Sequence, residues 1–110
     1  MNSMIKPQLI SIVIPVLNEE RGIKQTISAI PKNKLSDEGY DLEIIVIDGN
    51  STDLTRDVSR AMGAKVVLEK RKGYGRAYKT GFHEAKGDII VTLDGTIRTL
   101  QNLFQIVFSN

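Results

Sequence analysis

Four short runs rich in β-branched and other apolar residues recur along the chain, and their order restricts the fold more than any other feature. The runs lie at 9–14, 42–47, 64–68 and 88–93. They show little alternation of polar and apolar residues, which is typical of strands buried on both faces of a parallel sheet. The segments between them carry apolar residues at helical spacing. This order predicts an α/β fold with a mainly parallel sheet of about four strands flanked by helices.

Residues between the first two runs predict where individual elements begin and end. Pro15 is expected to end the first strand, and Asn18 is expected to cap a helix that continues through 23–30. Pro31 should stop that helix. The polar stretch 32–41 is interpreted as a loop.

The later connections are interpreted in the same way. Turn-forming residues at 48–53 predict the start of another helix, with Ser51 as a capping residue and an end near Gly63. A helix opened by glycine is expected over 73–86, and a terminal helix is expected over 97–109.

Composition excludes several classes of protein. The length of 110 residues indicates one domain, 1–110. Fifteen basic and thirteen acidic residues leave a net charge of +2, and aromatic residues make up 5%, which argues against nucleic-acid binding. The absence of cysteine excludes disulfides and thiolate metal sites and favours a cytoplasmic setting. The run 9–17 is too short for a membrane span. Because His83 is the single histidine, a metal site would need oxygen ligands, which favours Mg²⁺ or Mn²⁺.

Charged side chains follow the predicted strands at the points where the strands end. Asp48 follows the second strand and Asp94 the fourth. In open α/β sheets, ligands bind beyond the carboxyl ends of the strands. Carboxylates in that position suit a hard cation or a ribose hydroxyl, although each acid alone could equally cap the next helix. Their matched positions favour a functional role for the pair.

Residues 70–79, which we call the basic segment, combine five basic residues with Gly73 and Gly75 at the start of a predicted helix. Glycines let backbone amides approach an anion, and a helix N-terminus adds positive potential. The segment therefore suggests a phosphate site, although a solvated basic turn would have the same composition. It matches neither the Walker A pattern nor the dinucleotide pattern, because Tyr78 stands where each requires a glycine.

Taken together, four segments resemble glycosyltransferase family 2, whose members are inverting enzymes with an A-type fold that use nucleotide-activated sugars. The similarity covers about residues 9–95 and is greatest to the dolichyl- or polyprenyl-phosphate mannose synthases. It rests on 12–20 (IVIPVLNEE), 45–53 (IVIDGNSTD), 72–81 (KGYGRAYKTG) and 85–94 (AKGDIIVTLD). The resemblance implies the Rossmann-like, nucleotide-binding half of that fold.

The resemblance also implies roles for particular residues. The donor would be a GDP- or UDP-linked sugar, the acceptor a lipid phosphate, and the metal Mg²⁺ or Mn²⁺. The residues concerned are Pro15, Asn18 and Glu19 for the base and ribose, Asp48 for the nucleoside, Lys72, Gly73, Gly75 and Arg76 for the diphosphate, and Asp94 for the metal.

Two departures from the family pattern bear on these roles. Gly49 follows Asp48 where many relatives carry a second acid, so the base remains open between guanine and uracil. The family's Asp-x-Asp metal motif is present as Asp94-Gly95-Thr96, which lacks one carboxylate and predicts weaker metal binding. No catalytic base can be named, and the chain is expected to be the donor-binding half of such an enzyme, truncated and weakly active or inactive alone.

Two other classes of function compete with this interpretation. A non-catalytic domain could self-associate through the apolar face of 97–109, which carries Phe104 and Phe108, and would form a homo-oligomer. A phospho-accepting switch would need acids after the first strand, where the chain instead reads Pro15-Val16-Leu17. For a transferase with a lipid acceptor, a location peripheral to the membrane is also possible.

Overall fold

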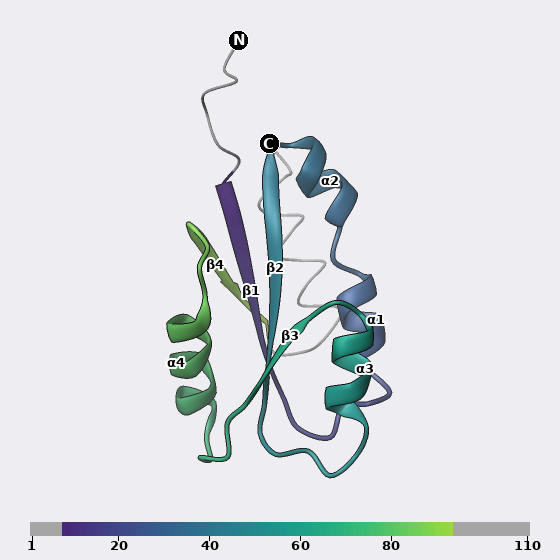
Figure 1. Cartoon of the computed structure of the whole chain (residues 1–110), viewed down its shortest axis with the longest axis vertical. Coiled ribbons are helices and arrows are strands. Elements are labelled where there is room, and N and C mark those ends of the chain that lie inside the picture. The colour runs from purple at the N-terminus through teal and green to yellow at the C-terminus, as the bar shows by residue number, and fades with distance from the viewer. Residues whose placement is uncertain (1–7, 94–110) are drawn as a thin grey trace.

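The computed structural model describes residues 8–93, and within them it forms one fully parallel sheet in the strand order β3-β2-β1-β4. Figure 1 shows the strands side by side, with helices on both sides of the sheet. The strands are β1 (Gln8–Val16), β2 (Tyr40–Asp48), β3 (Lys65–Leu68) and β4 (Ile89–Thr92). The helices are α1 (Ile23–Ser28), α2 (Lys32–Asp37), α3 (Thr55–Ala61) and α4 (Tyr74–Glu84). The α/β fold and the parallel sheet of four strands are thus confirmed.

The two central strands bury opposite sets of side chains because alternate residues of a strand face opposite sides of the sheet. One core contains Ile12, Ile14 and Val46, packed against α1, α2 and α3. The other contains Val13 and Ile45, against which α4 packs. Of the helices in residues 8–93, Figure 1 shows α4 on one side of the sheet and α1, α2 and α3 on the opposite side.

Helix α4 lies unusually close to the sheet. A Cβ atom at Gly81 would collide with the Val13 side chain, so this glycine permits the close approach. After the helix, the backbone N–H of Gly87 donates to Ser11 Oγ at 2.8 Å, and the Ser11 hydroxyl in turn donates to Glu43. These contacts fix the turn from α4 into β4 at the end of the sheet opposite the loops described below.

Several predicted boundaries are wrong, and the causes are local. Pro15 does not end β1, because it pairs with Ile47 in register. Its missing N–H faces the β4 side, where the described pairing stops at Val13, so no ladder hydrogen bond is lost. The stretch 32–41 is not all loop, because α2 occupies most of it and buries Leu35 completely.

Asn18 does not cap α1, and Ser51 does not cap α3. Helix α1 begins at Ile23, preceded by Gly22, and no side chain caps it. Neither does any side chain cap α3. Both polar residues instead take part in contacts between loops, described below. Strand β4 is also more open than predicted, with Ile90 42% exposed. The predicted helix 97–109 and Asp94 lie outside the described residues.

Candidate functional site

The loops that follow β1, β2 and β3 all lie at the carboxyl end of the parallel sheet, where ligands bind in open α/β folds (Figure 1). The backbone N–H of Gly49 donates to Val16 O at 2.9 Å, so the first two loops leave the sheet together. The backbone N–H of Glu69 donates to Asp48 O at 2.8 Å, which brings the third loop against the second. The three loops therefore form one continuous rim.

Loops 17–22 and 49–54 are tied together by hydrogen bonds, and we call this unit the double-loop wall. The backbone N–H of Asn18 donates to Ser51 Oγ at 2.8 Å, and the backbone N–H of Thr52 donates to Asn18 Oδ1 at 2.8 Å. The backbone N–H of Glu19 donates to Thr55 Oγ1 at 2.8 Å. Asn18 thus bridges the two loops with both its backbone and its side chain, which explains why it does not cap α1.

Asp48 lies at the base of this wall and is completely buried. Its Oδ2 accepts the backbone N–H of Asn50 at 3.0 Å and that of Ser51 at 2.8 Å. The Ser51 hydroxyl donates to Oδ1 at 2.5 Å, and Arg56 Nη1 lies 2.7 Å from Oδ2. A buried carboxylate needs this many donors to offset its lost hydration. The carboxylate therefore orders the second loop and presents no surface of its own to solvent.

Asp53 closes the far side of the wall. Its Oδ1 accepts the backbone N–H of Thr55 at 2.9 Å and also the Thr55 hydroxyl, and its Oδ2 accepts the backbone N–H of Glu20 at 3.3 Å. These donors, the Thr55 hydroxyl foremost, hold the pKa of the Asp53 carboxyl below its usual value. Asp53 is thus a further link between the two loops.

The predicted base and ribose residues differ in accessibility. Pro15 is buried within β1, whereas Asn18 and Glu19 are exposed at the start of the wall. Asn18 has a positive φ of 53° and Asn50 one of 78°, conformations that asparagine tolerates better than most residues. The structure therefore brings Asn18, Glu19 and the loop that Asp48 orders to one place on the rim.

The basic segment leads from β3 into α4. Gly73 precedes the helix with a φ of +109°, and a Cβ atom at Gly75 would meet nothing within 4 Å. Lys72 and Arg76 are exposed, and neither has an ion-pair partner among residues 8–93. The predicted phosphate residues therefore surround open space at a helix N-terminus.

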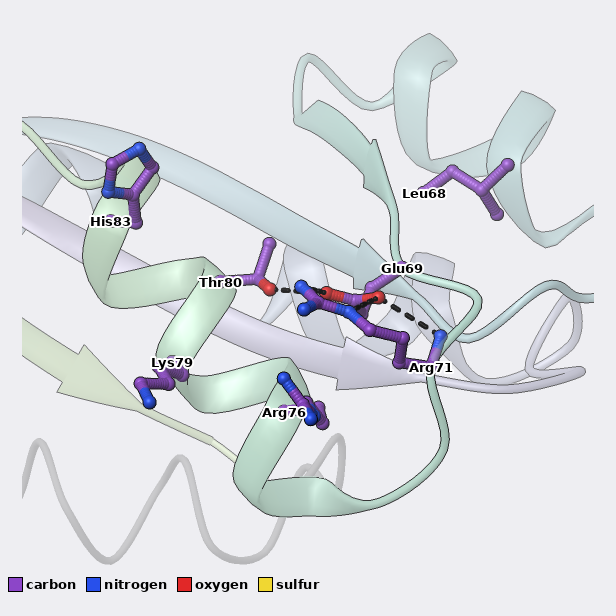
Figure 2. Close-up of a pocket in the computed structure, with 7 residues that line it drawn as sticks. All are labelled: Leu68, Glu69, Arg71, Arg76, Lys79, Thr80 and His83. Carbon is purple, nitrogen blue, oxygen red and sulfur yellow. Dashed lines mark hydrogen bonds and ion pairs between the residues drawn. The ribbon is translucent and has the colours of Figure 1, made fainter.

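A pocket of about 500 Å³ lies between α4 and the segment that follows β3 (Figure 2). Its lining is dominated by basic side chains and contains one acid; it comprises Leu68, Glu69, Arg71, Arg76, Lys79, Thr80 and His83. Figure 2 shows Thr80 directed toward Glu69, with the Arg71 guanidinium beside the same carboxylate. This pocket extends the positive surface of the basic segment along α4.

Like Thr55, Arg56 and Thr80, Glu69 takes part in the contacts of the site but was not singled out by the sequence analysis. Its carboxylate is only 8% exposed and accepts hydrogen bonds from Arg71 and Thr80. The Arg71 guanidinium, followed by the Thr80 hydroxyl, holds the pKa of Glu69 far below its usual value. The available signal was a lone acid between an apolar strand and three consecutive basic residues.

A metal centre is not formed by the described residues alone. Between residues 8 and 93, no group of three or more histidine, aspartate or glutamate side chains is placed to hold an ion. The predicted ligand Asp94 lies just outside this range. Within the same range, no helix is both long enough and apolar enough to cross a bilayer.

The amino-acid sequence is similar to those of known glycosyltransferases. The sequence model of Glycosyl transferase family 2 matches residues 11–95. An uncharacterized glycosyltransferase of Mycobacterium bovis is 39% identical over 85 residues, which are 77% of this chain and 35% of that protein. The undecaprenyl-phosphate 4-deoxy-4-formamido-L-arabinose transferase of Aeromonas hydrophila is 36% identical over 99 residues, covering 83% of this chain and 30% of its own length.

A solved structure is also similar. Glucosyl-3-phosphoglycerate synthase from Mycobacterium tuberculosis, crystallised with Mn²⁺, UDP and glucosyl-3-phosphoglycerate, superposes with a TM-score of 0.68 at 38% identity. The match covers 80% of this chain and 33% of that one. The chain thus spans about a third of the length of these relatives. The family match over residues 11–95 and the shared A-type fold show that this chain belongs to glycosyl transferase family 2.

Proposed function

We propose that this chain binds a nucleoside-diphosphate sugar across its rim, with the nucleoside on the double-loop wall and the diphosphate beside the basic segment. One observation carries the proposal. A rigid, internally hydrogen-bonded wall adjoins a helix N-terminus whose cations Lys72 and Arg76 have no ion-pair partner within the described residues. A nucleoside diphosphate has the matching division into a neutral planar part and an anionic part.

Each predicted residue has a role in this proposal. Asn18 and Glu19 contact the base and ribose from the exposed start of the wall, and Pro15 shapes the floor beneath them. Asp48 acts through the loop that it orders, because its carboxylate is buried. The open space at Gly75 lets the diphosphate approach the backbone. Positioned cations there would offset the charge that grows on the leaving diphosphate during transfer.

The metal and the acceptor complete the proposal. Asp94 would be a ligand of Mg²⁺ or Mn²⁺, and a cation bound there would share the diphosphate charge. The acceptor would be a lipid phosphate, met by a cytoplasmic protein at the membrane surface. Support comes from the relative of Aeromonas hydrophila, whose name specifies undecaprenyl phosphate, and from the solved relative that holds Mn²⁺ and UDP.

Isothermal titration calorimetry of the 110-residue chain tests donor binding. We expect heat of binding with UDP or UDP-glucose. Parallel runs with GDP or GDP-mannose decide the base, because the nucleotide that binds more tightly carries the base that the site prefers. Mn²⁺ should tighten binding in the parent chain but not in Asp94→Asn. Absence of binding to all four nucleotides, with and without Mn²⁺, would refute the proposal.

A matched pair of variants locates the diphosphate. Arg76→Ala removes a cation at the rim, and we expect about tenfold weaker UDP binding. Arg60→Ala removes an exposed cation from α3, on the other face of the sheet, and should leave binding unchanged. Equal effects of the two substitutions would show that net charge, rather than a site at the basic segment, determines affinity.

A further inference from the structure

Glu69 occupies a junction between three elements. It is the first residue after β3, its backbone N–H donates to Asp48 O at the tip of β2, and its side chain faces α4 (Figure 2). The residue is 7% exposed. An acid placed there has lost most of its hydration, so its position depends on the donors around it.

Four donors converge on its two carboxylate oxygens. Arg71 supplies Nε at 2.9 Å and its backbone N–H at 3.0 Å to Oε2, and Nη2 at 2.7 Å to Oε1. Thr80 donates its hydroxyl to Oε1 at 2.6 Å. The paired guanidinium contact is bidentate, which fixes orientation as well as distance.

These contacts secure the basic segment at both ends. The Arg71 contacts curl the chain directly after β3, and the Thr80 contact reaches into α4 beyond its first turn. Between these contacts lie Lys72, which has no ion-pair partner among residues 8–93, and Gly73, which has no side chain. The placement of these two residues relative to the double-loop wall therefore depends on the Arg71 contacts before them and on α4 after them, which Thr80 joins to Glu69.

The pocket lining shows which basic side chain pairs with Glu69 and which do not. Glu69 is the one acid there, and its charge is matched by Arg71. Arg76 and Lys79 line the same pocket with no ion pair to any described residue. The carboxylate thus pairs with one cation of the pocket and leaves the other two without an ion-pair partner in the described structure.

We propose that Glu69 is a positioning residue for the donor diphosphate: by holding Arg71 and Thr80, it fixes the basic segment at the distance from the wall that a nucleoside diphosphate spans. This inference rests on the proposed function and adds a residue that touches no substrate. It predicts that Glu69 affects affinity for phosphate groups and not affinity for the nucleoside.

The other end of the same strand and helix offers a matched control. Lys65 at the start of β3 pairs with Glu84 at the end of α4 at 2.8 Å. Glu84→Gln therefore removes an ion pair that joins the same two elements, far from the rim. Thr80→Val and Thr80→Ser form a second pair, because serine keeps the hydroxyl that Glu69 accepts and valine does not.

The experiment measures the affinity of each variant for UDP, uridine and inorganic pyrophosphate by calorimetry, with thermal unfolding followed by circular dichroism. We expect Glu69→Gln and Thr80→Val to weaken UDP and pyrophosphate about tenfold while uridine changes less than twofold. Glu84→Gln and Thr80→Ser should behave as the parent. If Glu69→Gln does not fold, the two Thr80 variants decide the question.

The outcomes separate this inference from the proposed function. Parallel loss of UDP and uridine, or no loss of UDP, would overturn the positioning role even though donor binding stands. Pyrophosphate binding that depends on Glu69, in a chain that binds no nucleotide, would support the positioning role and refute the proposed donor. A parent chain that binds neither UDP nor pyrophosphate would overturn both.

Discussion

The double-loop wall and the basic segment lie side by side on the rim but are built in opposite ways. In the wall, backbone donors and side-chain acceptors satisfy one another, with Asp48 buried beneath. In the basic segment, the cations are exposed, and their only internal acceptor in the described structure is Glu69. A preformed wall suits the nucleoside, which is recognised by its shape. Cations without an internal partner suit the diphosphate, whose negative charges can pair with them.

This difference predicts that the wall contributes to stability and the basic segment to affinity. Substitutions in the wall should unfold the protein more easily, whatever they do to binding. Substitutions of the exposed cations in the basic segment should change binding with little effect on unfolding.

Asp48→Ala should cause the largest loss. It leaves Arg56 and the Ser51 hydroxyl without their buried acceptor, and we expect a decrease of about 3 kcal/mol in the free energy of unfolding. Urea denaturation measures it. Asp57→Ala, which removes only an exposed pair with Arg60, is the control and should cost less than about 0.5 kcal/mol. Similar costs for both would contradict the structural role of Asp48.

Two glycines of the basic segment should respond in opposite directions. Gly73→Ala strains a backbone with φ of +109° and should destabilise by about 1 kcal/mol. Gly75→Ala enters open space within α4 and should stabilise by about 0.5 kcal/mol. Both should weaken UDP binding, the first by moving the loop and the second by blocking the backbone. A Gly75→Ala variant that binds UDP normally would show that the diphosphate does not approach there.

Acid should weaken the Glu69 anchor. The folded pKa of Glu69 lies well below the ordinary value of 4.5, so the carboxylate stabilises the fold fully above pH 4.5. This contribution decreases progressively as the pH falls from that value toward the folded pKa. Urea titrations from about pH 6 to pH 3 should show that stability falls less in Glu69→Gln than in the parent. Parallel curves would mean that the Arg71 and Thr80 contacts do not persist in solution.

Salt should weaken the affinity for UDP more than the affinity for uridine, and this is the smallest of the predicted effects. Raising NaCl from about 50 mM to about 500 mM should weaken UDP binding about threefold, because exposed cations are screened. Uridine binding, which depends on the wall, should stay within error. Calorimetry at both salt concentrations measures this, and equal salt dependence of the two ligands would contradict the division of the rim.

The order of the strands along the chain, and the gathering of polar loops at the carboxyl end of the sheet, were predictable from the sequence. The apolar runs correspond to the four strands, and the polar residues after the first three lie on one rim. Helix α2 was not predicted because its six residues carry a single buried apolar side chain, Leu35. A single apolar residue cannot display the helical spacing from which a helix is predicted. The role of Asn18 was predicted wrongly, as a helix cap. Its side-chain oxygen instead accepts the backbone N–H of Thr52, which lies 34 positions away in the sequence.

Local periodicity by itself determined the fold class, and four motif segments indicated the family through their resemblance to it. These properties depend on neighbours along the chain, which the sequence displays directly. Only the tertiary structure decided that Asp48 is buried, that Asn18 joins two loops, and that Glu69 anchors the basic segment. Each of these depends on which donors the folded sheet brings within hydrogen-bonding distance, and a sequence does not order its residues by distance in space.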